Sequence, residues 1–240
     1  MENLLKISPL DGRLALAASM VRKGSVVCDV GTDHAYLPIW LLQNGICPSA
    51  VACDINEGPL NSARAHAARY GCAEQITFCL TDGLRGLEPA SLGVQDIVIC
   101  GMGGELIARI YTEEAYTRLP HVRGILQPMS KADELRAVLA REGYRIEDER
   151  LAFAAGRIYT CMAVCYDGVT RTPTAAELVL GEIHIRRGGT DPLFAEYLRK
   201  AIQSAEKKYR GRCGGELDAS AEKALLDDLT AIAQKEGIAL

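Results

Sequence analysis

The sequence lacks the features of secreted and membrane-embedded proteins. No apolar run approaches the roughly 18 residues of a membrane-spanning helix, and residues 1–6 show no signal-peptide pattern. The nine cysteines include no C-x-x-C pair, and most of them lie within apolar, strand-like segments. We therefore expect buried, reduced thiols, no metal site and a cytoplasmic location.

A dinucleotide-binding glycine pattern is also missing. Residues 26–30 form an apolar, β-branched run that predicts a buried strand, and residues 35–42 predict a helix. The loop between them contains a single glycine, Gly31, where a pyrophosphate would need several, and Asp33 would repel phosphates. In α/β folds, nucleotide-like ligands bind at the glycine turn between a strand and the helix that follows it. S-adenosylmethionine, a sulfonium cation without phosphate, fits this acidic loop better than NAD.

A carboxylate follows at the spacing expected for a ribose ligand. The next predicted strand, residues 50–54, ends in Asp54, about 20 residues after Gly31. An acidic side chain at this spacing reaches ribose hydroxyls, and a helix-capping role for Asp54 is the alternative. The pattern thus predicts an adenosine-containing cofactor.

The order of predicted elements indicates an α/β fold. Helices are expected at residues 10–21, 56–70, 104–110 and 131–142, and strands at residues 76–80, 96–100 and 124–127. Two further strands, residues 144–152 and 157–166, are joined by a turn at Ala155 and Gly156. A mostly parallel, Rossmann-like sheet closed by an antiparallel hairpin is typical of class I methyltransferases and differs from the all-parallel dinucleotide fold.

The carboxyl-terminal part has a different character. Residues 1–169 are expected to form the methyltransferase domain, and residues 170–240 a helical appendage. The predicted elements are a helix over residues 174–187, a long helix from Asp191-Pro192 to about Tyr209, a turn at residues 211–215 and a helix over residues 220–236. The two longer helices would pair as an antiparallel, coiled-coil-like hairpin.

This appendage is more basic than the rest of the chain. Residues 171–212 contain nine basic and five acidic side chains, whereas the whole chain has a net charge of -4. Such a run is either a solvated helix face or a surface that attracts a polyanion such as RNA. The candidate RNA contacts are Arg186, Arg187, Lys207, Lys208 and Arg210.

Acidic and glycine residues follow the predicted strands. The carboxylates expected at the carboxyl edge of the sheet are Asp29, Asp54, Asp82 and Asp96. In methyltransferases an acidic residue at the position of Asp82 accepts a hydrogen bond from the adenine amino group, and an ordinary Asp-Gly turn is the alternative. Glycines between Gly101 and Gly104 would let cofactor and acceptor approach the backbone closely.

The Asn/Asp-Pro-Pro-aromatic loop of adenine-N6 methyltransferases is absent after this strand. An exocyclic amine needs a hydrogen-bond acceptor during attack, whereas a ring nitrogen already presents a lone pair in the base plane. Methylation of adenine N1 therefore requires alignment and dehydration but no obligatory base.

Four segments resemble motifs of one known family. Segments similar to the bacterial tRNA (adenine-22-N1)-methyltransferase family, TrmK, are Asp33-His34-Ala35-Tyr36-Leu37-Pro38, Gly101-Met102-Gly103-Gly104, Leu126-Gln127-Pro128 and the earlier Leu10-x-x-Arg13-Leu14. The resemblance covers essentially the whole chain. It implies S-adenosylmethionine as cofactor, adenine N1 of tRNA as acceptor, and a helical pair that helps to hold the tRNA. Met129 departs from the family pattern, because many relatives have asparagine there.

These patterns define two sets of candidate residues. The expected cofactor contacts are Asp29, Gly31, Thr32, Asp33, His34, Leu37, Asp54, Ile55, Asp82, Gly83, Leu84, Gly101, Met102 and Gly103. The candidates for positioning the target base are Tyr36, His34, Asp33 and Gln127. Tyr36 could stack on an adenine extruded from the RNA or pack in the core, and His34 could instead cap the following helix. A buried amide that satisfies core groups is the alternative for Gln127.

The leading interpretation is a tRNA methyltransferase that acts on adenine N1. The first alternative is an S-adenosylmethionine-dependent methyltransferase of another RNA, a protein or a small molecule. The second is a non-catalytic cofactor- or RNA-binding module, and an NAD-dependent oxidoreductase is disfavoured by the acidic loop. No membrane partner is expected, and the sequence leaves the oligomeric state open, a monomer being compatible with it.

Overall fold

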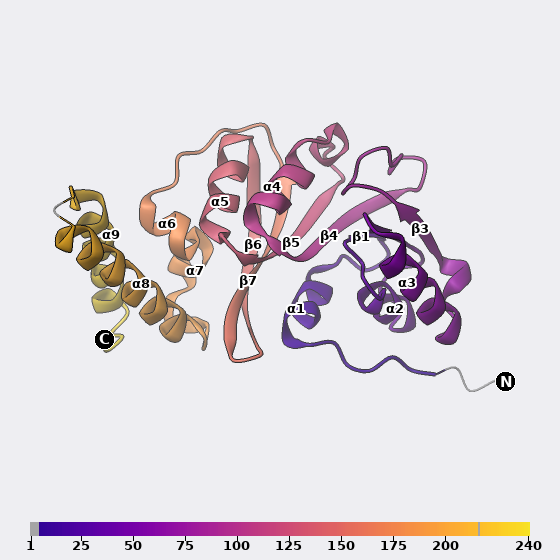
Figure 1. Ribbon diagram of the computed structural model, residues 1–240, viewed down its shortest axis with the longest axis horizontal. Helices are drawn as coiled ribbons and strands as arrows, with labels where there is room; N and C mark the ends of the chain where they lie inside the picture. Colours follow the sequence, from indigo (N-terminus) through magenta and orange to yellow (C-terminus); the bar gives the residue numbers. More distant parts are fainter. Residues whose placement is uncertain (1–4, 216) are drawn as a thin grey trace.

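A seven-stranded sheet lies at the centre of the computed structural model, which describes residues 5–215 and 217–240 (Figure 1). The strands are β1 (Val26–Val30), β2 (Ala50–Asp54), β3 (Ile76–Leu80), β4 (Val94–Gly103), β5 (Arg123–Ser130), β6 (Tyr144–Ala154) and β7 (Arg157–Tyr166). Their order across the sheet is β3-β2-β1-β4-β5-β7-β6, and β7 runs antiparallel to both of its neighbours. This arrangement confirms the predicted class I methyltransferase sheet.

Helices cover both faces of the sheet. One face carries α1 (Gly12–Met20), α2 (Tyr36–Gln43) and α3 (Glu57–Arg69), and the other carries α4 (Gly104–Thr112) and α5 (Ala132–Arg141). Short 3-10 turns are η1 (Ala73–Gln75), η2 (Ala115–Arg118) and η3 (Gly188–Thr190). The central strands are buried on both sides, and this explains their continuous apolar runs. In β4, for example, Val98 faces the α1–α3 layer, whereas Ile97 and Ile99 face α4 and α5.

The carboxyl-terminal helices differ in detail from the predicted ones. Instead of one helix over residues 174–187, there are α6 (Ala175–Leu180) and α7 (Glu182–Arg187), separated by Gly181 with φ of 90°. The long helix α8 (Phe194–Gly214) begins after Pro192 and continues through the predicted turn at 211–215. The helix α9 (Ser220–Lys235) follows as predicted.

The helices α8 and α9 pack on each other through an apolar stripe. This stripe includes Leu198, Ile202 and Ala205 of α8, which pack against Leu229 and Ala233 of α9. In the additional turn of α8, Arg212 pairs with Glu222 of α9 at 2.7 Å. None of the helices in the described ranges is long and apolar enough to cross a membrane.

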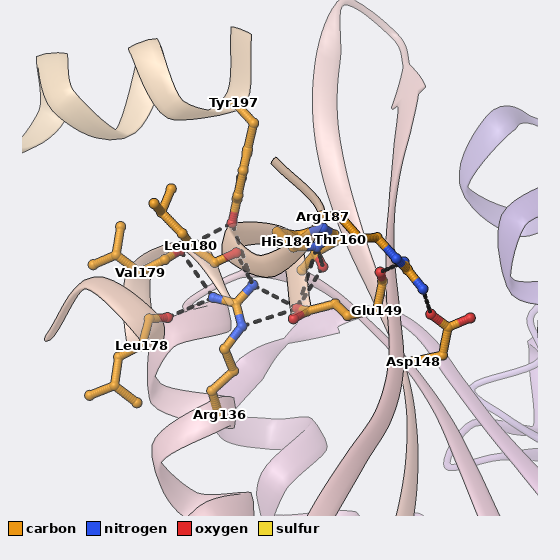
Figure 2. A network of polar contacts seen from close by, with 10 residues as sticks. All are labelled: Arg136, Asp148, Glu149, Thr160, Leu178, Val179, Leu180, His184, Arg187 and Tyr197. Atoms are coloured by element: carbon orange, nitrogen blue, oxygen red, sulfur yellow. Dashed lines mark hydrogen bonds and ion pairs between the residues drawn. The ribbon is translucent and has the colours of Figure 1, made fainter. Parts of the chain in front are cut away.

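A buried ion pair joins the sheet to α6 (Figure 2). Arg136 of α5 donates to Glu149 of β6 through Nε at 3.0 Å and Nη2 at 2.7 Å, and both side chains are almost completely buried. Arg136 Nη1 also donates to the carbonyl oxygens of Leu178 and Val179, at 2.6 and 3.0 Å. Carbonyls in the last turn of a helix have no partner within the helix, so Arg136 completes the end of α6.

Three more side chains extend this contact to α7. Thr160 has one hydroxyl proton and donates it to the Glu149 carboxylate at 2.8 Å. His184 Nε2 lies 3.2 Å from the Thr160 hydroxyl oxygen and is therefore the donor in this second contact. Burial lowers the pKa of His184, which keeps the imidazole neutral near pH 7. Arg187 donates to the main-chain carbonyl of Glu149 and to the Asp148 carboxylate, both at 2.6 Å. The helix α7 is therefore held to β6 by polar contacts.

We expect Glu149→Gln to lower the free energy of unfolding by roughly 3–5 kcal/mol, because Arg136 would stay charged and buried without a counter-ion. Chemical denaturation followed by circular dichroism measures this change. Asp227→Asn is the matched control, since Asp227 pairs with Lys223 on the exposed surface of α9, where an ion pair contributes little to stability. Equal stability of the two variants would contradict the structural importance of the buried pair.

Candidate functional site

A cavity of about 350 Å³ lies at the carboxyl ends of β1 and β4. Its lining residues come from the start of α1, the β1–α2 connection and the end of β4; they are Asp11, Arg13, Leu14, Asp29, Gly31, Thr32, Asp33, Tyr36, Leu37, Cys100 and Gly101. Size alone does not distinguish this cavity, because a groove beside α8 has a volume of about 330 Å³. Its position does, since ligands of open α/β sheets bind outside the carboxyl ends of the strands.

The loop after β1 has an unusual backbone. Gly31, Asp33 and Ala35 all have positive φ angles, of 75°, 51° and 55°. The left-handed region is unfavourable for the two non-glycine residues, and such strain gathers at functional sites. The amides of Gly31 and Thr32 both donate to the carbonyl oxygen of Cys53 in β2, at 2.8 and 2.9 Å, and hold the loop in place. The positive φ of Gly31 favours glycine at this position, and the flexible methyl end of Met102 packs close to it.

The cavity is acidic. Three carboxylates, those of Asp11, Asp29 and Asp33, line it together with a single guanidinium group, that of Arg13. Burial raises the pKa of Asp29 from its ordinary value of 3.8 to about 6. The Thr32 hydroxyl donates a hydrogen bond to Asp29 at 2.7 Å, which lowers the pKa, whereas the negative charge of the nearby Asp54 raises it further. Clustered carboxylates of this kind favour a cationic ligand and disfavour phosphates.

Arg13 is a site residue to which the sequence analysis assigned no role of its own. Its Nη1 donates to the side-chain oxygen of Gln127 at 2.9 Å and lies 3.7 Å from the sulfur of Met129, and its Nη2 pairs with Asp11 at 3.0 Å. Asp11 is the N-cap of α1. An N-cap carboxylate followed two residues later by arginine is the sequence signal for this arrangement.

Gln127 is fully buried, and its amide is engaged with protein groups. The side-chain oxygen accepts from Arg13 and from the amide of Gly101 at 3.3 Å, and the side-chain nitrogen donates to the carbonyl of Pro128 at 2.8 Å. These bonds link the end of β5 to the glycine run of β4. Gln127 therefore contacts the cavity lining through Arg13 and Gly101.

The glycines of β4 differ in their roles. Gly101 has a φ of 83°, which favours glycine, and Gly104 lies so close to the carbonyl of Lys131 that a Cβ would overlap it. A Cβ at Gly103 would lie 3.5 Å from the Ser130 hydroxyl, an ordinary contact. The neighbouring Cys100 has a pKa that burial raises well above the usual thiol range, so it stays a protonated thiol rather than a nucleophile. All nine cysteines are free, as expected.

Tyr36, His34 and His66 form a half-exposed cluster of rings beside the cavity. The three ring centroids are 5.3 to 5.4 Å apart. The Tyr36 side chain is among the exposed large side chains and lines the cavity. His34 Nε2 lies 3.5 Å from the carboxylate of Asp33. The cluster therefore offers an accessible aromatic surface at the rim.

The other expected cofactor residues lie outside the cavity lining. Asp54 ends β2, and its carboxylate accepts from the amide of Asn56 at 2.9 Å; the adjacent Ile55 is exposed. Asp82 pairs with Arg109 at 3.2 Å, whereas Leu84 is buried in the core with α4. The other expected cofactor residues that do not line the cavity are His34, Gly83, Met102 and Gly103.

Asp96 lies at the opposite edge of the sheet, contrary to expectation. The strand β4 begins at Val94, so Asp96 is near its amino end. Its buried carboxylate accepts from the amide and the Nε of Arg22, both at 2.7 Å. Asp96 is also the first residue of the strand predicted at residues 96–100, and the first residue of a parallel strand lies at the amino edge of the sheet.

The five candidate RNA contacts differ in their surroundings. Arg187 is engaged with β6, and Arg186 and Arg210 lie within 4 Å of Glu182 and Glu206 on their own helices. Lys207 and Lys208 are exposed on α8 and line a shallow groove. Within residues 5–215 and 217–240, no group of side chains suited to holding a metal ion was found.

Comparisons with known proteins agree with this geometry. A family model described as a methyltransferase domain matches residues 10–162. The tRNA (adenine(22)-N(1))-methyltransferase of Bacillus subtilis (strain 168) is 33% identical over 175 residues, which are 70% of this chain and 71% of the relative.

Solved structures extend the similarity to almost the whole chain. A Streptococcus pneumoniae protein in complex with S-adenosyl-L-methionine is 34% identical, with a TM-score of 0.77 over 94% of this chain and 99% of that one. The Bacillus subtilis m1A22 tRNA methyltransferase TrmK is 25% identical, with a TM-score of 0.78 over 96% and 99% of the two chains.

We expect Asp29→Asn to stabilise the protein at neutral pH. A carboxyl that titrates near pH 6 when folded and near pH 4 when unfolded disfavours folding above pH 6, by about 3 kcal/mol. This penalty shrinks as the pH falls from 6 towards 4. Thermal melts from pH 4.5 to 8 should therefore show a Tm difference between variant and wild type that grows with pH.

The control for this experiment is Asp33→Asn, in the same loop but with an exposed side chain. Because this side chain is exposed, the substitution should change the melting temperature little. A stabilisation by Asp29→Asn that does not change with pH would contradict the raised pKa.

Proposed function

This chain belongs to the family of the tRNA (adenine(22)-N(1))-methyltransferases, and we propose that it methylates N1 of adenine 22 in tRNA at the acidic cavity beside β1 and β4. Its cofactor is S-adenosylmethionine. The observation that supports the site most directly is the cavity itself. Three carboxylates and the Gly31 loop line it, and this loop lacks the glycine pattern that binds phosphates. The residues present fit a cationic, phosphate-free cofactor.

The roles of the cofactor-binding residues follow from their places along the sheet edge. Asp54, at the end of β2, would accept hydrogen bonds from the ribose hydroxyls. The exposed apolar side chain of Ile55 would lie against the adenine ring, and Asp82 would accept from its amino group. Asp29 and Asp33 face the cavity, where their carboxylates would stabilise the ammonium and sulfonium charges.

When bound, S-adenosylmethionine supplies a methyl group on a sulfonium, from which a thioether departs as the acceptor attacks in line. The residues of this chain need not remove a proton first, because adenine N1 presents a lone pair. Methylation places positive charge on the adenine, and the carboxylates of Asp11 and Asp33 at the cavity would stabilise that charge. Tyr36 would stack on the extruded base, and Gln127 would hold Arg13 at the rim.

The helices α8 and α9 are proposed to hold the tRNA outside the methyltransferase domain. Lys207 and Lys208 are exposed on α8 and available to phosphates. Arg187, in contrast, would act mainly by fixing α7 to β6, since both of its contacts are with β6. The Arg136 network lies between the two parts, so the binding surface would be set at a defined position relative to the cavity.

The function is tested by nucleoside mass spectrometry. A tRNA transcript with adenine at position 22 is incubated with the enzyme and S-adenosylmethionine carrying a deuterated methyl group, and its nucleosides are then analysed. We expect labelled N1-methyladenosine from this transcript and none from a matched transcript with guanine at position 22. Label on another nucleoside, or none at all, would overturn the proposal.

Asp54→Ala is expected to weaken binding of S-adenosylhomocysteine about ten- to a hundredfold. The loss of a charge-assisted hydrogen bond typically costs about 1.5–3 kcal/mol. Isothermal titration calorimetry measures the affinity, and Glu57→Ala serves as the control, because Glu57 is an exposed carboxylate in the first turn of α3. Unchanged binding in Asp54→Ala would remove Asp54 from the site.

A further inference from the structure

The loop between β1 and α2 contains a carbonyl group that its own helix cannot satisfy. His34 lies between Asp33 and Ala35, whose left-handed backbones persist only where the surrounding structure holds them. In a helix, a carbonyl accepts from the N–H group four residues later. For His34 that residue is Pro38, which has no N–H group, so the partner of this carbonyl must come from another element.

His66 of α3 supplies the missing donor. Its Nδ1 lies 3.1 Å from the carbonyl oxygen of His34. Because a carbonyl only accepts, the Nδ1 atom of His66 carries the proton in this contact. Among the hydrogen bonds of the described residues, this is the one that joins a side chain to the main chain of residues 33–35. It ties the cavity loop to the helix that follows β2.

The same imidazole ring packs against Tyr36. The two ring centroids are 5.4 Å apart and the planes are inclined by 38°, and the ring of His34 contacts both. Aromatic rings at such separations attract each other. Tyr36 is 43% exposed, so these two imidazoles limit the orientations that its ring can adopt at the rim of the cavity. His66 therefore holds both the main chain of the loop and the side chain that ends it.

We propose that His66 is a positioning residue with two separable tasks. Its Nδ1 proton holds the loop from which Asp33 faces the cofactor, and its ring holds Tyr36 against the target adenine. Asp33 and Tyr36 line the cavity whereas His66 does not, so His66 acts through these two residues. The role rests on the proposed tRNA methyltransferase function and extends the site to α3.

Two substitutions separate the two tasks. His66→Phe keeps an aromatic ring but removes the donor, so its affinity for S-adenosylhomocysteine should fall about three- to tenfold, the effect of one lost hydrogen bond. Its kcat for tRNA at saturating S-adenosylmethionine should stay close to that of the wild type. His66→Asn keeps an N–H donor at the same number of bonds from the main chain but removes the ring. It should bind S-adenosylhomocysteine like the wild type and lower kcat for tRNA about three- to tenfold.

The matched controls are His121→Phe and His121→Asn. His121 is exposed, and its ring contacts Tyr116 at a centroid distance of 6.1 Å. It precedes β5 and therefore lies at the amino edge of the sheet, away from the cavity. Isothermal titration calorimetry and initial rates of tRNA methylation should give wild-type values for both controls.

The tautomer of His66 tests the same contact in the unaltered protein. Two-bond proton–nitrogen correlation spectra at pH 8 distinguish an imidazole that carries its proton on Nδ1 from one that carries it on Nε2. The chain has four histidines, whose ring signals can be assigned through correlations with their own main-chain amides. We expect the proton of His66 on Nδ1.

Four results would contradict the inference or the function beneath it. A proton on Nε2 of His66, or wild-type affinity and kcat in both His66 variants, would overturn the positioning role. Equal losses of affinity and kcat in both variants, together with lower melting temperatures, would mark a purely structural residue and would also overturn it. Absence of N1-methyladenosine with the wild-type enzyme would instead overturn the proposed function, and it would leave the tautomer and the S-adenosylhomocysteine affinities as independent measurements.

Discussion

The buried pair of Arg136 and Glu149 is the constraint on which the arrangement of this molecule depends. Two charges removed from water need hydrogen-bond partners from the surrounding protein. Here those partners come from both parts of the chain, because Arg136 reaches the carbonyls of α6 and Glu149 accepts from Thr160 in β7. The carboxyl-terminal helices are therefore attached at one defined place on the sheet.

Local sequence patterns were sufficient to predict most of the sheet. The segments Ala50–Asp54 and Ile76–Leu80 are strands with the predicted bounds, because burial on both faces selects continuous apolar runs. The cavity loop was predictable for a related reason. Gly31 and the acidic residues near it reflect a local requirement for close approach and for negative charge.

The features that could not be predicted depend on partners distant in the sequence. Gly181, with a φ of 90°, ends α6, whereas Gly211 continues a helix, and nothing in the local pattern distinguishes the two. Arg13 meets Gln127, a residue 114 positions away.

The attachment of α6 has a consequence for how freely its sequence can vary. Arg136 binds the main-chain oxygens of Leu178, Val179 and Leu180, which every amino acid carries. The specificity of this joint therefore resides almost entirely on the sheet side, in one arginine and one glutamate. Substitutions should therefore be tolerated unequally at the two sides of this contact. Side chains on the solvent side of α6 should accept many replacements, whereas Arg136 and Glu149 should accept few.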